Sequence, residues 1–255
     1  MRPKALILAG LDPTGGAGII ADARVLSARG LFPLAVPTGL TVQTGKEVRE
    51  VFTPPARLFS RSLQGIEETH PISGVKVGMI PSPDIAREVD DFLRRQEEIP
   101  VVFDPVLAST GGTTLTPGEA RKIIPSIIRH STLVTPNARE LLEIGEEMSL
   151  SGTLEEVAFA IVRETGTPLL LTGGSGGQDA GKDLLFTTGG KKEFPGEYLE
   201  GKDFHGTGCL LSSALLSYLV DGYTLEEAVQ KGKEFTLSCL KKGFLSLDGR
   251  WFWDL

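Results

Sequence analysis

Short apolar runs that alternate with amphipathic helical segments constrain the fold of this chain most strongly. The apolar runs are only a few residues long, as is typical of strands buried on both faces of a sheet. Strands and helices alternate with short connections, which favours parallel strands linked by helices. We therefore expect a three-layer α/β fold, in which a mainly parallel central sheet lies between helices on both faces. The expected strands cover residues 5–9, 32–42, 75–77, 101–105, 132–134 and 168–172, and the expected helices cover 19–30, 57–69, 85–96, 119–129, 154–165 and 224–242.

Two features near the end of the chain extend this prediction. The runs 184–186 and 192–194 indicate a small antiparallel hairpin at the sheet edge, with its turn at Gly189 and Gly190. The segment 251–253 is apolar, and we expect it to pack on the body of the protein or on a partner.

The composition is that of a globular protein and argues against several classes of partner. Of 255 residues, 40% are hydrophobic and 23% are charged, and acidic residues outnumber basic ones by 33 to 26. This balance argues against a nucleic-acid surface, and no apolar run approaches the length of a membrane span. We find no linker, repeat or low-complexity segment, so we expect one domain over residues 1–255. Only two cysteines are present, which is typical of a protein in a reducing cytoplasm.

A glycine turn at residues 206–208 opens an apolar helical segment of about four turns. Gly206 and Gly208 let the backbone turn sharply and approach a ligand closely, and Thr207 adds a hydroxyl donor. The first N–H groups of the helix have no partner within it, and the positive end of the helix dipole points the same way. This combination predicts an anion-binding site, although a glycine loop can also simply cap a helix.

Cys209 falls in the first turn of the same expected helix. A thiol at that position tends to lose its proton more easily, so we expect a lowered pKa for Cys209. The alternative is a small side chain that fits a tight turn.

A second glycine-rich loop, residues 10–18, lies between an expected strand and an expected helix. Such a connection is where a ligand pocket begins in an α/β sheet, although the glycine spacing is not the dinucleotide fingerprint. Taken singly, Asp12 and Asp22 are typical of a helix cap or a solvated acid. Gln43 ends an expected strand, and its amide can both donate to and accept from an aminopyrimidine edge.

Three side chains offer oxygen atoms for a metal ion. Asp104 ends an expected strand and is followed by residues that do not start a helix, which favours a metal or a metal-bound water over a cap. Asn137 and Glu140 lie three residues apart at an expected helix start, so they share one face. On their own they are more typical of a helix capping box than of a metal site.

Three catalytic motifs match by spacing and are rejected on context. Residues 173–177 have the spacing of the hydrolase nucleophile elbow, with Ser175 as nucleophile, but 178–182 is expected to be a loop where the elbow needs a helix. Residues 176–182 and 196–202 are spaced like a Walker A loop, but aspartate follows each where serine or threonine would bind Mg²⁺.

In their order along the chain, these motifs resemble those of the hydroxymethylpyrimidine and phosphomethylpyrimidine kinases of thiamin synthesis. That family is a branch of the ribokinase-like superfamily, which also includes pyridoxal kinases. The resemblance covers nearly the whole chain, and it implies a ribokinase-like fold and phosphoryl transfer from Mg-ATP to a hydroxymethyl group. The matching stretches are 10–18 with Asp22, 41–43, 76–79, 104–106, 135–140 and 205–209.

The resemblance also implies a role for each motif. The glycine turn would be the anion hole for the transferring phosphate, and Cys209 stands where most of the superfamily carries an aspartate base. Asn137 and Glu140 match an Asn-x-x-Glu motif that would organise Mg²⁺ through water and phosphate, and the resemblance favours this role over a cap. A homodimer is also expected. The implied residues are Gly206, Thr207, Gly208 and Cys209 for catalysis; Gly10, Asp12, Gly18, Asp22, Gln43, Met79 and Val106 for the pyrimidine; Thr172, Gly174 and the glycine turn for ATP; and Asp104, Asn137 and Glu140 for the metal.

The chain departs from the family pattern near the expected phosphates. The family usually has Lys-Gly-Gly-His where residues 172–175 are Thr-Gly-Gly-Ser, and a lysine where Ser109 and Thr110 stand. Lys182 and Lys202 are candidates to replace the missing positive charges. Two other functions therefore stay open: another vitamin kinase, such as a pyridoxal kinase, or a catalytically weak protein that binds the pyrimidine or its phosphate.

Overall fold

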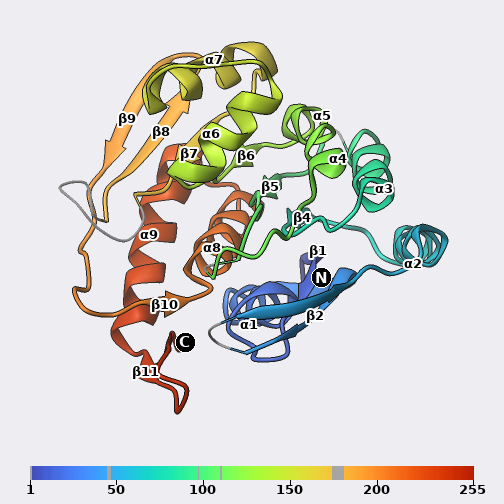
Figure 1. Cartoon of the computed structure of the whole chain (residues 1–255), viewed down its shortest axis with the longest axis horizontal. Helices are drawn as coiled ribbons and strands as arrows, with labels where there is room; N and C mark the ends of the chain where they lie inside the picture. Colours follow the sequence, from blue (N-terminus) through green and yellow to red (C-terminus); the bar gives the residue numbers. More distant parts are fainter. Residues whose placement is uncertain (1, 45–46, 97, 110, 174–180) are drawn as a thin grey trace.

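The fold is built on one large sheet whose strands follow the order β3-β2-β1-β4-β5-β6-β7-β8-β9 (Figure 1). The structure is a computed structural model, and it describes residues 2–44, 47–96, 98–109, 111–173 and 181–255. The pairings from β2 to β7 along this order are parallel, whereas β3, β8 and β9 pair antiparallel. These strands are β1 (Lys4–Leu11), β2 (Phe32–Gln43), β3 (Val48–Phe52), β4 (Gly74–Val77), β5 (Val101–Phe103), β6 (Leu133–Val134), β7 (Leu169–Leu171), β8 (Asp183–Thr187) and β9 (Gly190–Phe194).

Helices cover both faces of this sheet. One face packs against α2 to α7 and the other against α1, α8 and α9, so the expected three layers and edge hairpin are confirmed. The helices are α1 (Gly18–Ala28), α2 (Ala56–Thr69), α3 (Pro83–Leu93), α4 (Gly118–Arg121), α5 (Ile124–Arg129), α6 (Ala138–Glu147), α7 (Leu154–Thr165), α8 (Thr207–Val220) and α9 (Leu225–Lys241). No helix in the described part of the chain is long and apolar enough to cross a membrane.

The first strand shows why the apolar runs predict a sheet buried on both faces. Successive side chains of a strand point to opposite faces. Accordingly, Leu6 and Leu8 pack into the core under α2 and α3, whereas Ala5, Ile7 and Ala9 pack into the core that includes α8. All five side chains are almost inaccessible to solvent, so every position of this run has to be apolar.

The structure differs from the sequence prediction in the segment 119–129. A single helix was expected, but α4 ends at Arg121 and α5 begins at Ile124, with Pro125 in its first turn. Proline has no N–H to donate within a helix and fits best at a helix start, so it divides the segment in two.

A second, smaller sheet holds the C-terminal segment against the body. Its order is β10-β12-β11, with β10 (Phe204–His205), β11 (Phe244–Leu245) and β12 (Trp251–Phe252). Trp253 follows β12 and is 1% exposed in a core that it shares with α1, α8 and α9. The apolar tail therefore packs on the body of the protein, as one of the two expected arrangements, and it pairs with the residues just before the glycine turn.

Candidate active site

One cavity opens at the edge of the sheet where the parallel strands end. Its volume is about 560 Å³, and it extends from the loop after β1, past the N-terminus of α8, to α9. The connections after parallel strands meet at this edge, which is where ligands bind in open α/β sheets. The predicted site residues that line it are Gly10, Asp12, Gly18, Gln43, Met79, Asp104, Val106, Asn137, Glu140, Thr172, Gly206, Thr207, Gly208 and Cys209.

Two predicted site residues remain. Gly174 lies outside the described residues, as do Ser175 and most of the rejected hydrolase motif. Asp22 is described, but it is completely buried in α1, where its carboxylate contacts Lys76 and Ser213. The structure therefore corrects the prediction that Asp22 binds the substrate directly, because its carboxylate lies behind the cavity wall.

The glycine turn has the backbone geometry of an anion site. Gly206 is the N-cap of α8 in the left-handed conformation, with φ of 74°, and no side chain caps the helix there. A Cβ on Gly206 would lie 1.8 Å from the carbonyl oxygen of Gly16, so only glycine fits. The turn is thus packed against the first glycine loop, and the uncapped N–H groups of the first turn of α8 face the cavity.

Asp12 ties the two glycine segments together. Its Oδ2 accepts hydrogen bonds from His205 Nε2 at 2.7 Å and from the Ala17 N–H at 3.0 Å. Its Oδ1 accepts from the Thr14 N–H at 2.8 Å. Burial alone would raise the pKa of Asp12, but the hydrogen bonds from His205 and Thr14 outweigh it and lower that pKa. The carboxylate therefore organises the loop and links it to the turn 193 positions further along the chain.

The buried ammonium of Lys76, which was not predicted as a site residue, lies beneath the glycine turn. Lys76 Nζ is 3.5 Å from carboxylate oxygens of both Asp22 and Asp104, and the lysine is completely buried. Ser212 donates to the same Asp104 oxygen at 3.0 Å, and Ser213 donates to Asp22 at 2.8 Å. Burial opposes the charged lysine, but the two carboxylates outweigh it and raise the pKa of Lys76.

One signal in the sequence could have identified this group. Lys76 is the single charged residue of β4, a strand that is buried along its whole length. A charge in such a position has to be paired, so a buried lysine in a central strand predicts carboxylate partners elsewhere in the chain.

The structure overturns the prediction of a lowered pKa for Cys209. Burial raises the pKa of this thiol to about 12, and Asp22 and Asp104 add to the effect, although Lys76 opposes it. Cys209 is 8% exposed, and the burial and nearby carboxylates outweigh the N-terminus of α8. The side chain is therefore a neutral thiol at neutral pH.

Asp104, Asn137 and Glu140 offer oxygen atoms on one wall of the cavity. Asn137 and Glu140 form a complete capping box, with both reciprocal hydrogen bonds at 3.0 Å. Burial and the nearby Asp104 raise the pKa of Glu140 to about 8, so this carboxyl is mostly protonated at neutral pH when no cation is bound. Glu140 can therefore cap α6 and also contribute to a cation site at the cavity wall.

The chemistry of this wall fits Mg²⁺. The described residues hold no group of three or more histidine, cysteine or acidic side chains that could bind a metal alone. Mg²⁺ usually retains several waters and is bound by one or two carboxylates together with substrate phosphates. Burial, and after it the nearby Asp104, raise the pKa of Glu140, and a cation bound between these two carboxyl groups would favour the ionised form. The buried hydroxyl of Thr135 lines the same cavity without a hydrogen-bond partner in the described chain.

The cavity is narrow and mostly apolar near the first glycine loop. A Cβ on Gly10 would lie 2.6 Å from the terminal methyl of Met79, so the flexible Met79 side chain would have to move to admit a larger residue there. Gln43 lines the cavity at the end of β2, and its Oε1 accepts a hydrogen bond from Thr41 at 3.1 Å. That contact orients the amide and leaves its N–H₂ group as a donor.

The far end of the cavity is formed by β7, β8 and α9. Asp183 accepts from the Gly173 N–H at 2.7 Å and from Lys233 Nζ at 2.5 Å, which joins the end of β7 to α9. Thr172 lines the same region, and its hydroxyl donates to the carbonyl of Pro136 at 3.4 Å.

Comparison with known proteins agrees with this geometry. The sequence model of the phosphomethylpyrimidine kinase family matches residues 12–250. A hydroxymethylpyrimidine/phosphomethylpyrimidine kinase from Aquifex aeolicus is 34% identical over 239 residues, which cover 93% of this chain and 94% of that protein. A thiamine biosynthesis multifunctional protein from Corynebacterium efficiens is 32% identical over 232 residues, and this chain spans only 31% of that longer protein.

Solved structures give the same assignment. The crystal structure of a phosphomethylpyrimidine kinase from Clostridium difficile has a TM-score of 0.78 and 29% identity, covering 93% of this chain and 99% of that one. Pyridoxal kinase from Bacillus subtilis, in an ADP complex, has a TM-score of 0.87 with 23% identity, and covers 100% of this chain and 97% of that one. The second likeness concerns the fold alone, which is the ribokinase-like fold. With the family match extending over most of its length, the chain belongs to the phosphomethylpyrimidine kinase family and is a phosphotransferase.

Proposed function

We propose that the protein uses ATP and Mg²⁺ to phosphorylate 4-amino-5-hydroxymethyl-2-methylpyrimidine and then its monophosphate, giving the pyrimidine diphosphate for thiamin synthesis. One observation carries the proposal. A single cavity combines an amide and an apolar wall, suited to a small heteroaromatic ring, with an anion-binding helix N-terminus and a wall of oxygen donors. The names of the relatives and the position of Gln43 at the apolar end support the pyrimidine as the acceptor.

The glycine turn would hold the phosphoryl group as it transfers. Amide N–H groups at the N-terminus of α8 are positioned by the backbone before any ligand arrives, so they stabilise developing negative charge without reorganising. Phosphoryl transfer depends mainly on such positioning and charge stabilisation. Lys76 supports the turn from below by neutralising Asp104 and holding it in place.

Cys209 would position the hydroxymethyl group rather than act as a thiolate. Its thiol stays protonated at neutral pH because of burial. A neutral thiol next to the turn can hold the substrate hydroxyl in line with the phosphate. Because the transition state of phosphoryl transfer is loose, catalysis depends little on proton abstraction by a base.

Asp104, Asn137 and Glu140 would hold Mg²⁺ through water and phosphate oxygens. When bound, Mg²⁺ neutralises charge on the phosphates and orients them. Within this chain, the capping box keeps the Glu140 carboxylate fixed at the cavity wall.

We also propose a homodimer located in the cytoplasm. Apolar side chains of Leu40, Val42 and Phe52 are exposed on β2 and β3, which gives a surface that a second copy could cover. Both cysteines are free thiols, as expected in a reducing compartment. Sedimentation equilibrium at micromolar protein would give a single species of monomer mass if the dimer proposal is wrong.

A substrate panel tests the reaction. Purified protein is incubated with Mg-ATP and, separately, the hydroxymethylpyrimidine, its monophosphate and pyridoxal, and products are resolved by mass. We expect the monophosphate and then the diphosphate of the pyrimidine. Phosphorylation of pyridoxal at a higher kcat/KM would assign the chain to the other vitamin kinase, and tight pyrimidine binding without ATP consumption would indicate a binding protein.

A further inference from the structure

The charges of the cavity present a problem for a polyanionic nucleotide. Among the described residues, the cavity lining contains eight carboxylates and four lysine or arginine side chains. The carboxylates belong to Asp12, Glu47, Asp104, Glu140, Asp183, Glu197, Asp203 and Glu234, and the cations to Lys76, Lys202, Lys233 and Arg250. A triphosphate entering this cavity would meet net negative charge, so the few cations that can reach it matter.

Three of these four cations are already engaged by carboxylates. Lys76 contacts Asp22 and Asp104, as described above. Lys233 contacts Asp183 at 2.5 Å, and Arg250 pairs with Asp203. A cation that already faces a carboxylate contributes less to an incoming anion, because the neighbouring negative charge repels that anion.

Lys202 is the exception among the described residues. No carboxylate oxygen of the described chain lies within 4 Å of its ammonium, which instead lies 4.3 Å from the centre of the Trp251 ring. An aromatic face attracts an ammonium without neutralising its charge. Lys202 therefore keeps its full charge at the wall of the cavity.

Lys202 lies close in sequence to the glycine turn. Lys202 lies four positions before Gly206, in the turn that leads into β10. Phe204 of β10 pairs with Trp251 of β12, and their rings contact each other at 5.7 Å. The small sheet therefore places Trp251 in the strand next to β10, the strand that enters the glycine turn. Figure 1 shows β10 close to α9, and Phe204 packs with residues of that helix.

We propose that Lys202, held on the Trp251 ring by the C-terminal strand, binds the β- and γ-phosphates of the nucleotide. The proposal rests on the proposed function only in taking a nucleoside triphosphate as the phosphoryl donor. The other lysine suggested by the sequence, Lys182, does not fit this role. It is absent from the cavity lining and lies 3.9 Å from Glu193 on the outer hairpin.

The test is a binding series on the full-length protein. The dissociation constants of adenosine, AMP, ADP and ATP are measured by calorimetry for wild type, Lys202→Met, Lys202→Arg and Lys182→Met. We expect Lys202→Met to weaken ADP and ATP about tenfold, as for the loss of one charge-assisted contact, and adenosine less than twofold. Lys202→Arg should recover most of the affinity, and Lys182→Met, which removes the same charge elsewhere, should match wild type.

The role of the Trp251 ring beneath Lys202 is tested in the same assay. Trp251→Phe keeps an aromatic face and should bind ADP nearly as wild type does, whereas Trp251→Leu should weaken the binding of ADP more than that of adenosine. Melting temperatures of all variants show whether the fold is intact. If the leucine variant unfolds, the Lys202 series decides alone.

Two results would overturn the proposal. If Lys202→Met bound ADP with the affinity of the wild type, Lys202 would not contribute to nucleotide binding. If the variant lost the same affinity for adenosine as for ADP, the contribution of Lys202 would not depend on the phosphates. These outcomes are separate from the reaction itself. A protein that binds ADP through Lys202 but phosphorylates no pyrimidine would contradict the proposed function and support this inference.

Discussion

Replacing Lys76 with methionine tests the charge network beneath the glycine turn. The substitution keeps most of the buried side-chain volume and removes the one ammonium that lies between Asp22 and Asp104. Both carboxylates are almost completely buried, so each would be left without its cation. Breaking a buried ion pair in this way costs about 3–5 kcal/mol of the free energy of unfolding, and we expect that loss at pH 8.

The loss should depend on pH in a defined direction. Burial raises the pKa of Asp22 to about 6 in the folded protein, above the value of 3.8 for a free carboxyl. A carboxyl with a raised folded pKa loses stability as pH rises from its unfolded to its folded pKa, so protonation at low pH relieves the cost. Without Lys76 the pKa of Asp22 rises further. The deficit relative to wild type should therefore shrink at pH 5 by about 1.4 kcal/mol for each additional unit.

Urea unfolding at pH 5 and pH 8 measures both effects. The matched control is Lys122→Met, because Lys122 forms a close ion pair with Glu119 but is largely exposed, and we expect no measurable change. Adding Asp22→Asn to the Lys76 variant should recover part of the lost stability at pH 8. A deficit below about 1 kcal/mol, or one that is the same at both pH values, would refute the buried-charge argument.

Three further predictions concern the reaction. For Cys209→Ala we expect kcat to fall by less than about tenfold, whereas a fall of two to four orders of magnitude would indicate a general base. In the wild type, this thiol should be alkylated very slowly at pH 8, because its pKa is raised. Gln43→Ala should raise the KM for the pyrimidine about tenfold through the loss of a buried hydrogen bond, and an unchanged KM would remove Gln43 from the substrate contacts. In the wild type, Mg²⁺ should bind more tightly as pH rises toward 8, because the raised pKa of Glu140 keeps its carboxyl protonated below that pH. In Glu140→Gln, Mg²⁺ should bind more weakly and without this pH dependence; a variant with only a lowered melting temperature would make Glu140 a cap alone.

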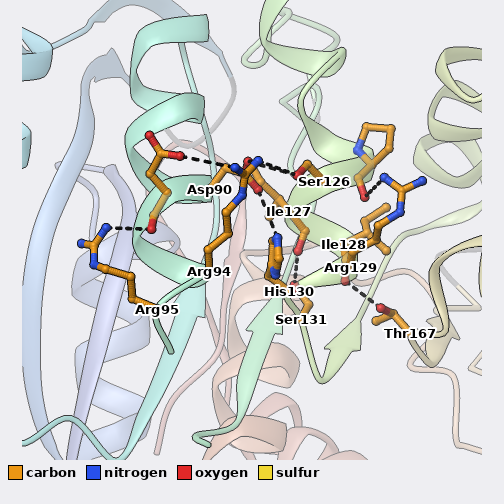
Figure 2. A network of polar contacts seen from close by, with 12 residues as sticks. Asp90, Arg94, Arg95, Ser126, Ile127, Ile128, Arg129, His130, Ser131 and Thr167 are labelled. Atoms are coloured by element: carbon orange, nitrogen blue, oxygen red, sulfur yellow. Dashed lines mark hydrogen bonds and ion pairs between the residues drawn. The ribbon is translucent and has the colours of Figure 1, made fainter. Parts of the chain in front are cut away.

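A separate polar network lies far from the cavity and carries no part of these predictions. Asp90 of α3 accepts from Arg94 and from Ser126 of α5, and Arg95 pairs with Glu67 of α2 (Figure 2). These contacts join helices on one face of the sheet, where partly exposed ion pairs contribute little to stability.

Local patterns in the sequence were sufficient for the architecture. The apolar runs placed the central parallel strands, and the glycine pair 189–190 placed the hairpin of β8 and β9. The spacing of Asn137 and Glu140 predicted the capping box that starts α6. Each of these features depends on residues that are near one another in sequence, so periodicity and cap chemistry reveal them.

The chemical state of the site depended on residues that only folding brings together. Cys209 has a raised pKa because the completed core excludes water from it and places it near Asp22 and Asp104. The first glycine loop meets His205 across most of the length of the chain, and β12 pairs with β10 across the whole of α8 and α9. Burial and long-range pairing set these charges, and neither is encoded in the spacing of neighbouring residues. The sequence thus predicted where the reactive groups would gather, and the tertiary structure decided which of them carry charge.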